Sequence, residues 1–185
     1  MIPSRAKRVF KAKIFDVYQW RQKMFDGSYE TFEFVQRPDT VIVLATVKNK
    51  LVILKQKQPN TNWYYSSPAG RMDVPGETPK QAALRELLEE TGMRPEKIIH
   101  WKTIKHRGKI RQNVYFYIAK NCKKVTGQKL DPGEKIEVKL MGFDSFLNLV
   151  QSSINRHWLA EMLVDIYQAK LYPKYKKTLR NLIFK

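Results

Sequence analysis

Short runs rich in aromatic and β-branched residues follow one another over the first third of the chain, and such runs form β-strands. The sequence Asp26-Gly27-Ser28 between two of these runs is typical of a hairpin turn. A run over 40–47 is almost entirely apolar and β-branched, which indicates a buried central strand. The pattern predicts strands at 9–15, 18–24, 29–35, 40–47, 51–55, 98–104, 112–118 and 136–141.

The apolar pattern takes a helical period after residue 78, and capping residues bracket the segment that carries it. Thr78 can cap the first turn, Pro79 suits the first helical position, and Gln81 completes a capping box. Gly92 is the residue at which we expect this helix to end. Strands in front and helices behind indicate an α+β domain. The pattern predicts helices at 79–91, 143–151 and 156–170, with Pro173 interrupting the chain before a basic tail.

Three carboxylates, those of Glu86, Glu89 and Glu90, share one face of the helix predicted at 79–91. No Lys or Arg stands three or four residues further along the same helix to neutralise them. Mg²⁺ prefers carboxylate oxygens, so the residues alone fit a magnesium site and a solvated acidic face equally well. The opposite side of the helix holds the residues that we expect to pack on the core: Leu84, Leu87, Leu88 and Thr91.

Composition is that of an ordinary globular protein. The 185 residues suffice for one domain with a sizeable core, and apolar and charged residues make up 43% and 28% of them. No apolar run approaches the roughly 20 residues of a membrane helix, and residues 1–13 lack the apolar core of a secretory signal. Cys122 is the single cysteine, which suits a reducing compartment. We therefore expect a soluble cytoplasmic protein.

Net charge is the unusual property, because 35 Lys and Arg against 17 Asp and Glu give +18. Such a field attracts polyanionic substrates, although a general lysine bias would also produce lysines along the whole chain. The acids are less evenly spread, and like charges at helical spacing repel one another. A bound cation would explain why six of them crowd one short stretch: Asp73, Glu77, Glu86, Glu89, Glu90 and Glu96.

This acidic stretch resembles the signature of the Nudix hydrolases, Gly-x5-Glu-x7-Arg-Glu-U-x-Glu-Glu-x-Gly-U, where U is a bulky apolar residue. From Glu77 to Met93 all eight defined positions match at the family's spacing. Six residues instead of five separate Gly70 from Glu77, in a Pro75-Gly76 turn where an extra residue is easily accommodated. The matching positions are Glu77, Arg85, Glu86, Leu87, Glu89, Glu90, Gly92 and Met93.

The resemblance extends to the segments 37–41 and 67–70, which look like those of the subfamily that cleaves ADP-ribose and nucleotide sugars. It covers residues from about 8 to 170. It implies a Nudix α/β/α sandwich with a mixed sheet, an N-terminal antiparallel sheet and C-terminal helices, in a homodimer held by the N-terminal sheet. We therefore expect a dimerisation element at 1–37, a hydrolase domain at 38–172, and a basic tail at 173–185 packed as part of the same unit.

The resemblance also implies roles for individual residues. Arg85 and Glu77 would pair and hold the metal-binding side chains in place. Glu134, on a loop after the motif, would be the general base, with Asp131 as the alternative. The predicted substrate contacts are Arg37, Gln56 and Gln58. The predicted Mg²⁺ ligands, which Mn²⁺ would also accept, are Glu86 and Glu90, with Glu89 as a further ligand, and the backbone carbonyl of Ala69.

The predicted reaction is metal-dependent hydrolysis of the pyrophosphate bond of a small nucleotide, an ADP-ribose or a nucleotide sugar, without a membrane partner. Many ADP-ribose enzymes have Gln-x-Arg where Gln56-Lys57-Gln58 stands here, and Glu where Ser66 stands, so the substrate is left open. The alternatives are hydrolysis of nucleoside polyphosphates or of RNA 5′ ends, the one case in which nucleic acid would be a partner, and a nucleotide sensor without activity.

Overall fold

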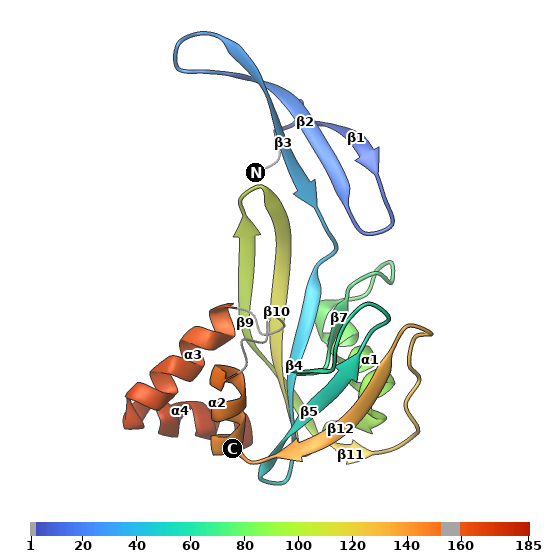
Figure 1. Cartoon of the computed structure of the whole chain (residues 1–185), viewed down its shortest axis with the longest axis vertical. Coiled ribbons are helices and arrows are strands. Elements are labelled where there is room, and N and C mark those ends of the chain that lie inside the picture. Colours follow the sequence, from blue (N-terminus) through green and yellow to red (C-terminus); the bar gives the residue numbers. More distant parts are fainter. Residues whose placement is uncertain (1–2, 153–159) are drawn as a thin grey trace.

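A long mixed β-sheet runs through most of the molecule in the computed structural model, which describes residues 3–152 and 160–185 (Figure 1). Its strands are β1 (Lys7–Lys11), β2 (Asp16–Lys23), β3 (Tyr29–Gln36), β4 (Thr40–Val47), β5 (Lys50–Lys57), β6 (Tyr64–Ser66), β7 (Ala69–Arg71), β9 (Lys97–Arg107), β10 (Ile110–Lys120) and β12 (Lys135–Met141). A separate antiparallel pair joins β8 (Met93–Arg94) to β11 (Lys123–Lys124). The helices are α1 (Pro79–Thr91), α2 (Phe143–Ser152), α3 (Ala160–Leu171) and α4 (Pro173–Phe184).

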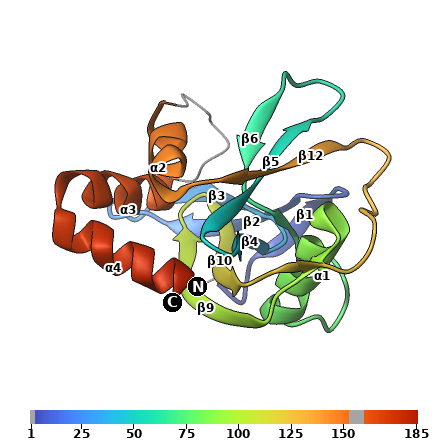
Figure 2. The same ribbon diagram turned by 90° about the horizontal axis from the view of Figure 1, so that it is seen from below.

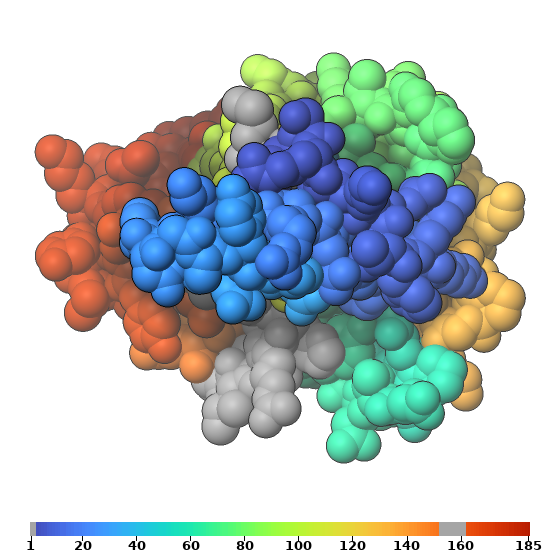
Figure 3. All heavy atoms as spheres, turned by 90° about the horizontal axis from the view of Figure 1, so that it is seen from above, coloured from blue at the N-terminus to red at the C-terminus, as the bar shows by residue number. Residues whose placement is uncertain are grey.

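The first three strands form an antiparallel arm, residues 7–36, that projects from the body (Figure 1). Gly27 turns the β2–β3 hairpin at a φ of 89°, and the Asp26 carboxylate accepts hydrogen bonds from the amide and hydroxyl of Ser28. The arm continues into the body through two residue pairs in which β3 runs parallel to β10. Seen from above, its strands (blue) lie across the top of the molecule (Figure 3).

Parallel strands β4 and β10 form the centre of the body, and helices lie on both sides of it (Figure 2). Alternate side chains of β4 face opposite sides of the sheet. Val43 and Ala45 pack with α1, whereas Leu44 packs in the cluster that includes residues of α2, α3 and α4. The predicted α/β/α sandwich with a mixed sheet is therefore confirmed. No helix in the described part of the chain is long and apolar enough to cross a membrane.

Most predicted strands differ from the observed ones by a few residues, and two segments differ more. Strand β1 ends before residue 12, because residues 12–15 turn the chain into β2. Residues 173–184, expected to be a basic tail, form helix α4, in which Leu179 and Ile183 are buried in the core. A proline at the first helical position starts this helix and does not interrupt it. The beginning of the helix predicted at 156–170 lies outside the described residues.

Helix α1 begins and ends as predicted, and its buried face keeps Leu87 and Thr91 but is otherwise shifted from the predicted one. The Thr78 hydroxyl accepts from the Gln81 amide at 3.3 Å, the Gln81 side chain accepts from the Thr78 amide at 2.9 Å, and Gly92 ends the helix at a φ of 68°. Leu84 and Leu88, expected in the core, are partly exposed. Two alanines on the buried face let the helix approach the sheet closely. The buried residues of α1 are Ala82, Ala83, Leu87, Glu90 and Thr91.

Candidate active site

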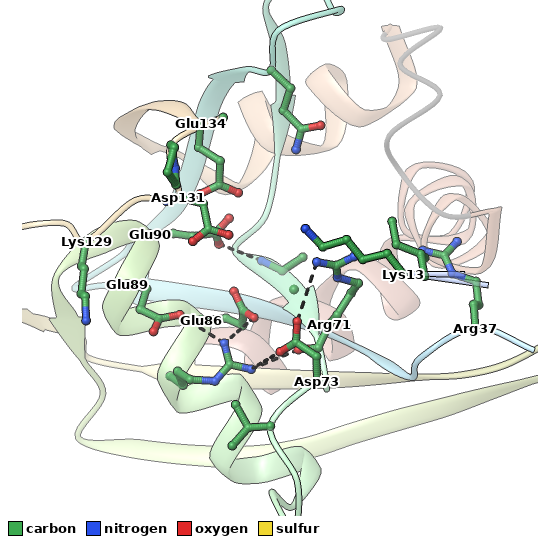
Figure 4. Close-up of a pocket in the computed structure, with 18 of the residues that line it drawn as sticks. Lys13, Arg37, Arg71, Asp73, Glu86, Glu89, Glu90, Lys129, Asp131 and Glu134 are labelled. Carbon is green, nitrogen blue, oxygen red and sulfur yellow. Dashed lines mark hydrogen bonds and ion pairs between the residues drawn. The ribbon is translucent and has the colours of Figure 1, made fainter. Parts of the chain in front are cut away.

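A cleft of about 980 Å³ opens between α1, β7, the turn before β2 and the loop that enters β12 (Figure 4). Figure 4 shows Lys13 and Arg37 on the side of the cleft away from Asp131 and Glu134. The carboxylates that line the cleft are those of Asp73, Glu86, Glu89, Glu90, Asp131 and Glu134. The basic residues are Lys13, Arg37, Arg71, Arg85 and Lys129. Most of the acids therefore lie on α1 and the loop, and Lys13 and Arg37 lie across the cleft from the loop.

Arg85 donates hydrogen bonds to several of the acidic residues beside the cleft. Its Nε and Nη2 donate to the two oxygens of Glu77 at 2.9 and 3.0 Å, a bidentate pair. Its Nη1 donates to Glu86 at 2.7 Å and to Glu89 at 3.1 Å, and its Nη2 also reaches the Arg71 carbonyl at 3.0 Å. The hydrogen bonds that Arg85 donates to Glu77 raise the pKa of Arg85 above its already high ordinary value, so the guanidinium stays charged. Arg85 thereby fixes two of the three glutamates on the cleft face of α1.

Gly70 allows the Glu86 carboxyl group to lie directly against the backbone of β7. A β-carbon at residue 70 would stand 1.9 Å from Cδ of Glu86, far inside any real contact. The extra residue between Gly70 and Glu77 is absorbed in a turn. There the Glu77 amide donates to the Val74 carbonyl at 3.1 Å, and Gly76 has a φ of 77°. The insertion therefore leaves the close approach of Gly70 and Glu86 in place.

Burial controls the protonation of two glutamates of α1. Glu90 is 4% exposed, and its Oε2 accepts from the Ala69 amide at 2.9 Å. Burial raises the pKa of Glu90 well above the ordinary value, against the opposing effect of that hydrogen bond. Burial likewise raises the pKa of Glu86 to about 7, although its hydrogen bond with Arg85 acts in the other direction. Glu89 adds to both effects, because like charges disfavour ionisation of their neighbours.

The donor set on α1 suits a hard divalent cation. Its glutamates offer oxygen ligands, Gly70 leaves room beside Glu86 that a β-carbon would fill, and a cation would offset the repulsion among the carboxylates. In residues 3–152 and 160–185 no group of three or more His, Cys, Asp or Glu side chains is arranged to hold an ion as it stands. Arg85 and the Ala69 amide each take one oxygen of these carboxylates, Oε1 of Glu86 and Oε2 of Glu89 and Glu90.

The loop before β12 is hydrogen-bonded to the C-terminal end of α1, where the last carbonyls lack partners within the helix. Backbone amides supply three of these hydrogen bonds and side chains supply two, at 2.6–3.2 Å. The loop therefore brings its later residues to the cleft in a fixed relation to α1. The donors are Val125, Thr126, Lys129 and the side chains of Lys124 and Gln128, and the acceptors are the carbonyls of Glu89, Glu90, Thr91 and Gly92.

Glu134 and Asp131 approach the cleft on this loop (Figure 4). The Glu134 carboxylate accepts from the Asp131 amide at 3.3 Å. Burial raises the pKa of Glu134, and the charges of Asp131 and Glu89 raise it further. A carboxylate with a raised pKa is a better proton acceptor than an ordinary one, provided that it reaches the reacting water.

Comparison with known proteins decides the family, since residues 35–162 match the model of the NUDIX domain. The chain belongs to the NUDIX family. The match includes α1, the cleft-lining strands of the body and the loop with Glu134, and it confirms the resemblance inferred from the motif. With the motif complete, the chain is a Nudix pyrophosphohydrolase, as predicted.

Relatives of this Nudix enzyme cover most of its length. An ADP-ribose pyrophosphatase of Bacillus subtilis (strain 168) is 30% identical over 150 residues, which make up 79% of this chain and 80% of that protein. A methanol dehydrogenase activator of Bacillus methanolicus is 31% identical over 150 residues, 78% and 77% of the two chains. A solved structure described as an ADP compounds hydrolase has a TM-score of 0.72 at 17% identity and covers 94% of both chains, which shows the shared fold.

The three residues expected to contact substrate do not all reach the Nudix cleft. Arg37 and Gln58 line it. Gln56 does not line the cleft: its side chain is buried at 8% exposure and donates to the Ser66 hydroxyl instead. Sequence reasoning missed Lys13 and Lys129, which also line the cleft. Nothing in the sequence distinguishes these two from the many other lysines.

Proposed function

We propose that this Nudix enzyme hydrolyses the pyrophosphate bond of a nucleoside diphosphate linked to another moiety, of the ADP-ribose or nucleotide-sugar type. The observation that carries the proposal is the set of glutamates that Arg85 holds on one wall of a cleft that Glu134 enters from the loop. The 30% identity to an ADP-ribose pyrophosphatase supports this substrate class. The cations Lys13 and Arg37, across the cleft, offer partners for the phosphates.

Glu86, Glu89 and Glu90, with the Ala69 carbonyl, would hold Mg²⁺, or Mn²⁺ in its place. When bound, the ion neutralises the diphosphate and promotes attack by water on phosphorus. Arg85 would keep its bidentate pair with Glu77 and would hold Glu86 and Glu89 through its Nη1, each by one oxygen. The charge of Arg85 then favours the ionised carboxylates that ligation requires.

Glu134 would accept the proton of the attacking water at its carboxylate, with Asp131 as the alternative base. The raised pKa of Glu134 suits this role, and the docked loop limits how far the carboxylate moves. Arg37 and Gln58 would position the nucleotide. We also expect the arm to form a homodimer contact, because it exposes Phe10 and Phe25 to solvent.

A substrate panel tests the proposal. Purified protein is incubated with Mg²⁺ and ADP-ribose, UDP- and GDP-sugars, diadenosine polyphosphates or nucleoside triphosphates, and the products are separated by chromatography. Release of AMP and ribose 5-phosphate from ADP-ribose, only with a divalent ion, is the expected result. Release of inorganic phosphate from triphosphates, with ADP-ribose intact, would overturn the substrate class.

Replacement of the most buried glutamate tests the metal assignment. Glu90→Gln keeps the shape of the side chain but removes its charge, so turnover should fall by at least about 100-fold with little change in melting temperature. Glu30→Gln, on the exposed surface of the arm, is the matched control and should retain full activity. A fully active Glu90→Gln variant contradicts the assignment.

Hydrolysis at RNA 5′ ends is the second candidate. An RNA pyrophosphohydrolase of Francisella tularensis subsp. mediasiatica (strain FSC147) is 42% identical over 62 residues, although these make up 34% of this chain and 37% of that protein. The net charge of +18 would favour a polyanion. Pyrophosphate release from 5′-triphosphate RNA that declines steeply with salt, in preference to hydrolysis of ADP-ribose, would favour this candidate.

A further inference from the structure

A second cavity of about 470 Å³, here called the arm cavity, opens beside the catalytic cleft. The two spaces share Lys13, Ile14 and Arg37 as wall residues. The remaining walls of the arm cavity come from the end of β1 and from the segment that links β3 to β4. A ligand in the cleft can therefore extend past Arg37 into this cavity without crossing α1 or the loop with Glu134.

Three cations line the arm cavity with two acids, of which Asp16 is already paired with Arg8. The ammonium groups of Lys11 and Lys13 make no hydrogen bond or ion pair with any residue in the described part of the chain. Arg37 packs its guanidinium over the Phe15 ring at 5.8 Å, and its buried Nε has no hydrogen-bond partner among the described residues. Lys11 and Lys13 can therefore donate to an anion without giving up an existing hydrogen bond.

Both acids of the arm cavity are already engaged. The Asp16 carboxylate accepts from Arg8 at 3.1 Å. Asp39 accepts from the amide and the side chain of Asn113, each at 2.8 Å, and from the Tyr115 hydroxyl at 3.5 Å. The positive charge that remains is a natural site for an anion with several acceptor oxygens.

We propose that the arm cavity binds a phosphate group that the substrate carries in addition to its pyrophosphate. The inference rests on the proposed function, because the catalytic cleft must hold the pyrophosphate for the substrate to reach across Arg37. The preferred substrate is then a nucleoside diphosphate derivative phosphorylated on one of its two halves, the half that lies towards the turn at residues 12–15. A terminal phosphate supplies the charge and the acceptors that Lys11, Lys13 and Arg37 lack.

Three matched substrates test this inference: ADP-ribose, ADP-ribose with an extra phosphate on the adenosine ribose, and ADP-ribose with the extra phosphate on the distal ribose. The wild-type enzyme should have a kcat/KM about tenfold higher for one phosphorylated isomer than for ADP-ribose, the effect of one charge-assisted contact. The other isomer should gain nothing. The preference should decline as the salt concentration rises.

The Lys11→Met variant tests whether the preference for the phosphorylated isomer depends on the arm cavity, because Lys11 lines the arm cavity but not the catalytic cleft. It should remove most of the preference, lowering kcat/KM for the preferred isomer more than for ADP-ribose. Lys7→Met, the same change on the same strand and outside both cavities, is the control and should leave the preference intact. Equal kcat/KM values for all three substrates, or a preference that Lys11→Met leaves unchanged, would overturn the inference.

Binding of inorganic phosphate separates this inference from the proposed function. If no substrate of the panel is hydrolysed, the proposed function fails. Titration calorimetry with phosphate then tests the cavity directly. Phosphate binding that is lost in Lys11→Met and kept in Lys7→Met supports the anion site, whereas equal binding to both variants contradicts it.

Discussion

Substitution of Gly70 by alanine should disable the site while leaving the fold intact. The added β-carbon would stand 1.9 Å from Cδ of Glu86, and an ordinary contact needs at least 3.4 Å, so the carboxyl group must move by about 1.5 Å. This displacement breaks the 2.7 Å hydrogen bond between Arg85 and Glu86. Misplacement of a reacting group by about 1 Å costs on the order of 100-fold in rate. We expect kcat for the pyrophosphatase reaction to fall by at least that factor.

The melting temperature separates a local effect from unfolding. The Glu86 side chain borders the open cleft and can turn into it, so Gly70→Ala should lose no more than one charge-assisted hydrogen bond, about 1.5–3 kcal/mol of unfolding free energy. Gly108→Ala is the control, because a β-carbon there meets nothing within 4 Å. Both variants are assayed with ADP-ribose over a range of Mg²⁺ concentrations. Activity of Gly70→Ala within about threefold of the wild type would refute the close packing on which the argument rests.

Three further outcomes can be measured. Arg85→Lys should lower kcat by at least about tenfold, because an ammonium group cannot keep the bidentate pair with Glu77 and still reach the cleft; a fully active variant would show that the pair is dispensable. Because the pKa of Glu86 is raised to about 7, the unfolded chain ionises at lower pH than the folded one, and the metal-free enzyme loses stability as pH rises from 4.5 through about 7. The loss of unfolding free energy is roughly 3 kcal/mol, since one pKa unit corresponds to about 1.4 kcal/mol. In EDTA, Glu86→Gln should therefore melt above the wild type at pH 8 and level with it at pH 5, and identical curves at both values would disprove this linkage. Burial raises the pKa of the Cys122 thiol to about 11, so this thiol should react with Ellman's reagent only when the protein unfolds; rapid labelling of the native enzyme would contradict its burial.

The sequence predicted the acidic part of the site well because one helix carries most of it. The period of α1 places Glu86 and Glu90 one turn apart, and the resemblance to the Nudix signature implied the pair of Arg85 with Glu77. The helix face that packs on the core was predicted less well. A helical wheel shows which residues share a side, but only the neighbouring sheet decides that Ala82 and not Leu84 is buried.

The lysines of the site could not be predicted, in contrast to Arg37, because their position depends on contacts between distant segments. Lys13 reaches the cleft only because β3 runs beside β10 and thereby sets the position of the arm. Helix α4 escaped prediction for a similar reason. Its sequence carries lysines at several positions, and Leu179 and Ile183 become recognisable as a buried stripe only once α3 and the sheet lie beneath them.

The hydrogen bonds between the loop and the end of α1 limit how this enzyme can be re-engineered. An insertion between Lys124 and Lys129 would change the spacing of the donors of five hydrogen bonds and move Glu134 relative to the glutamates of α1. An insertion between Lys129 and Glu134 would leave those anchors in place. Loop libraries intended to change substrate preference should therefore vary length on the Glu134 side of Lys129, where new contacts can be added without detaching the loop from the helix.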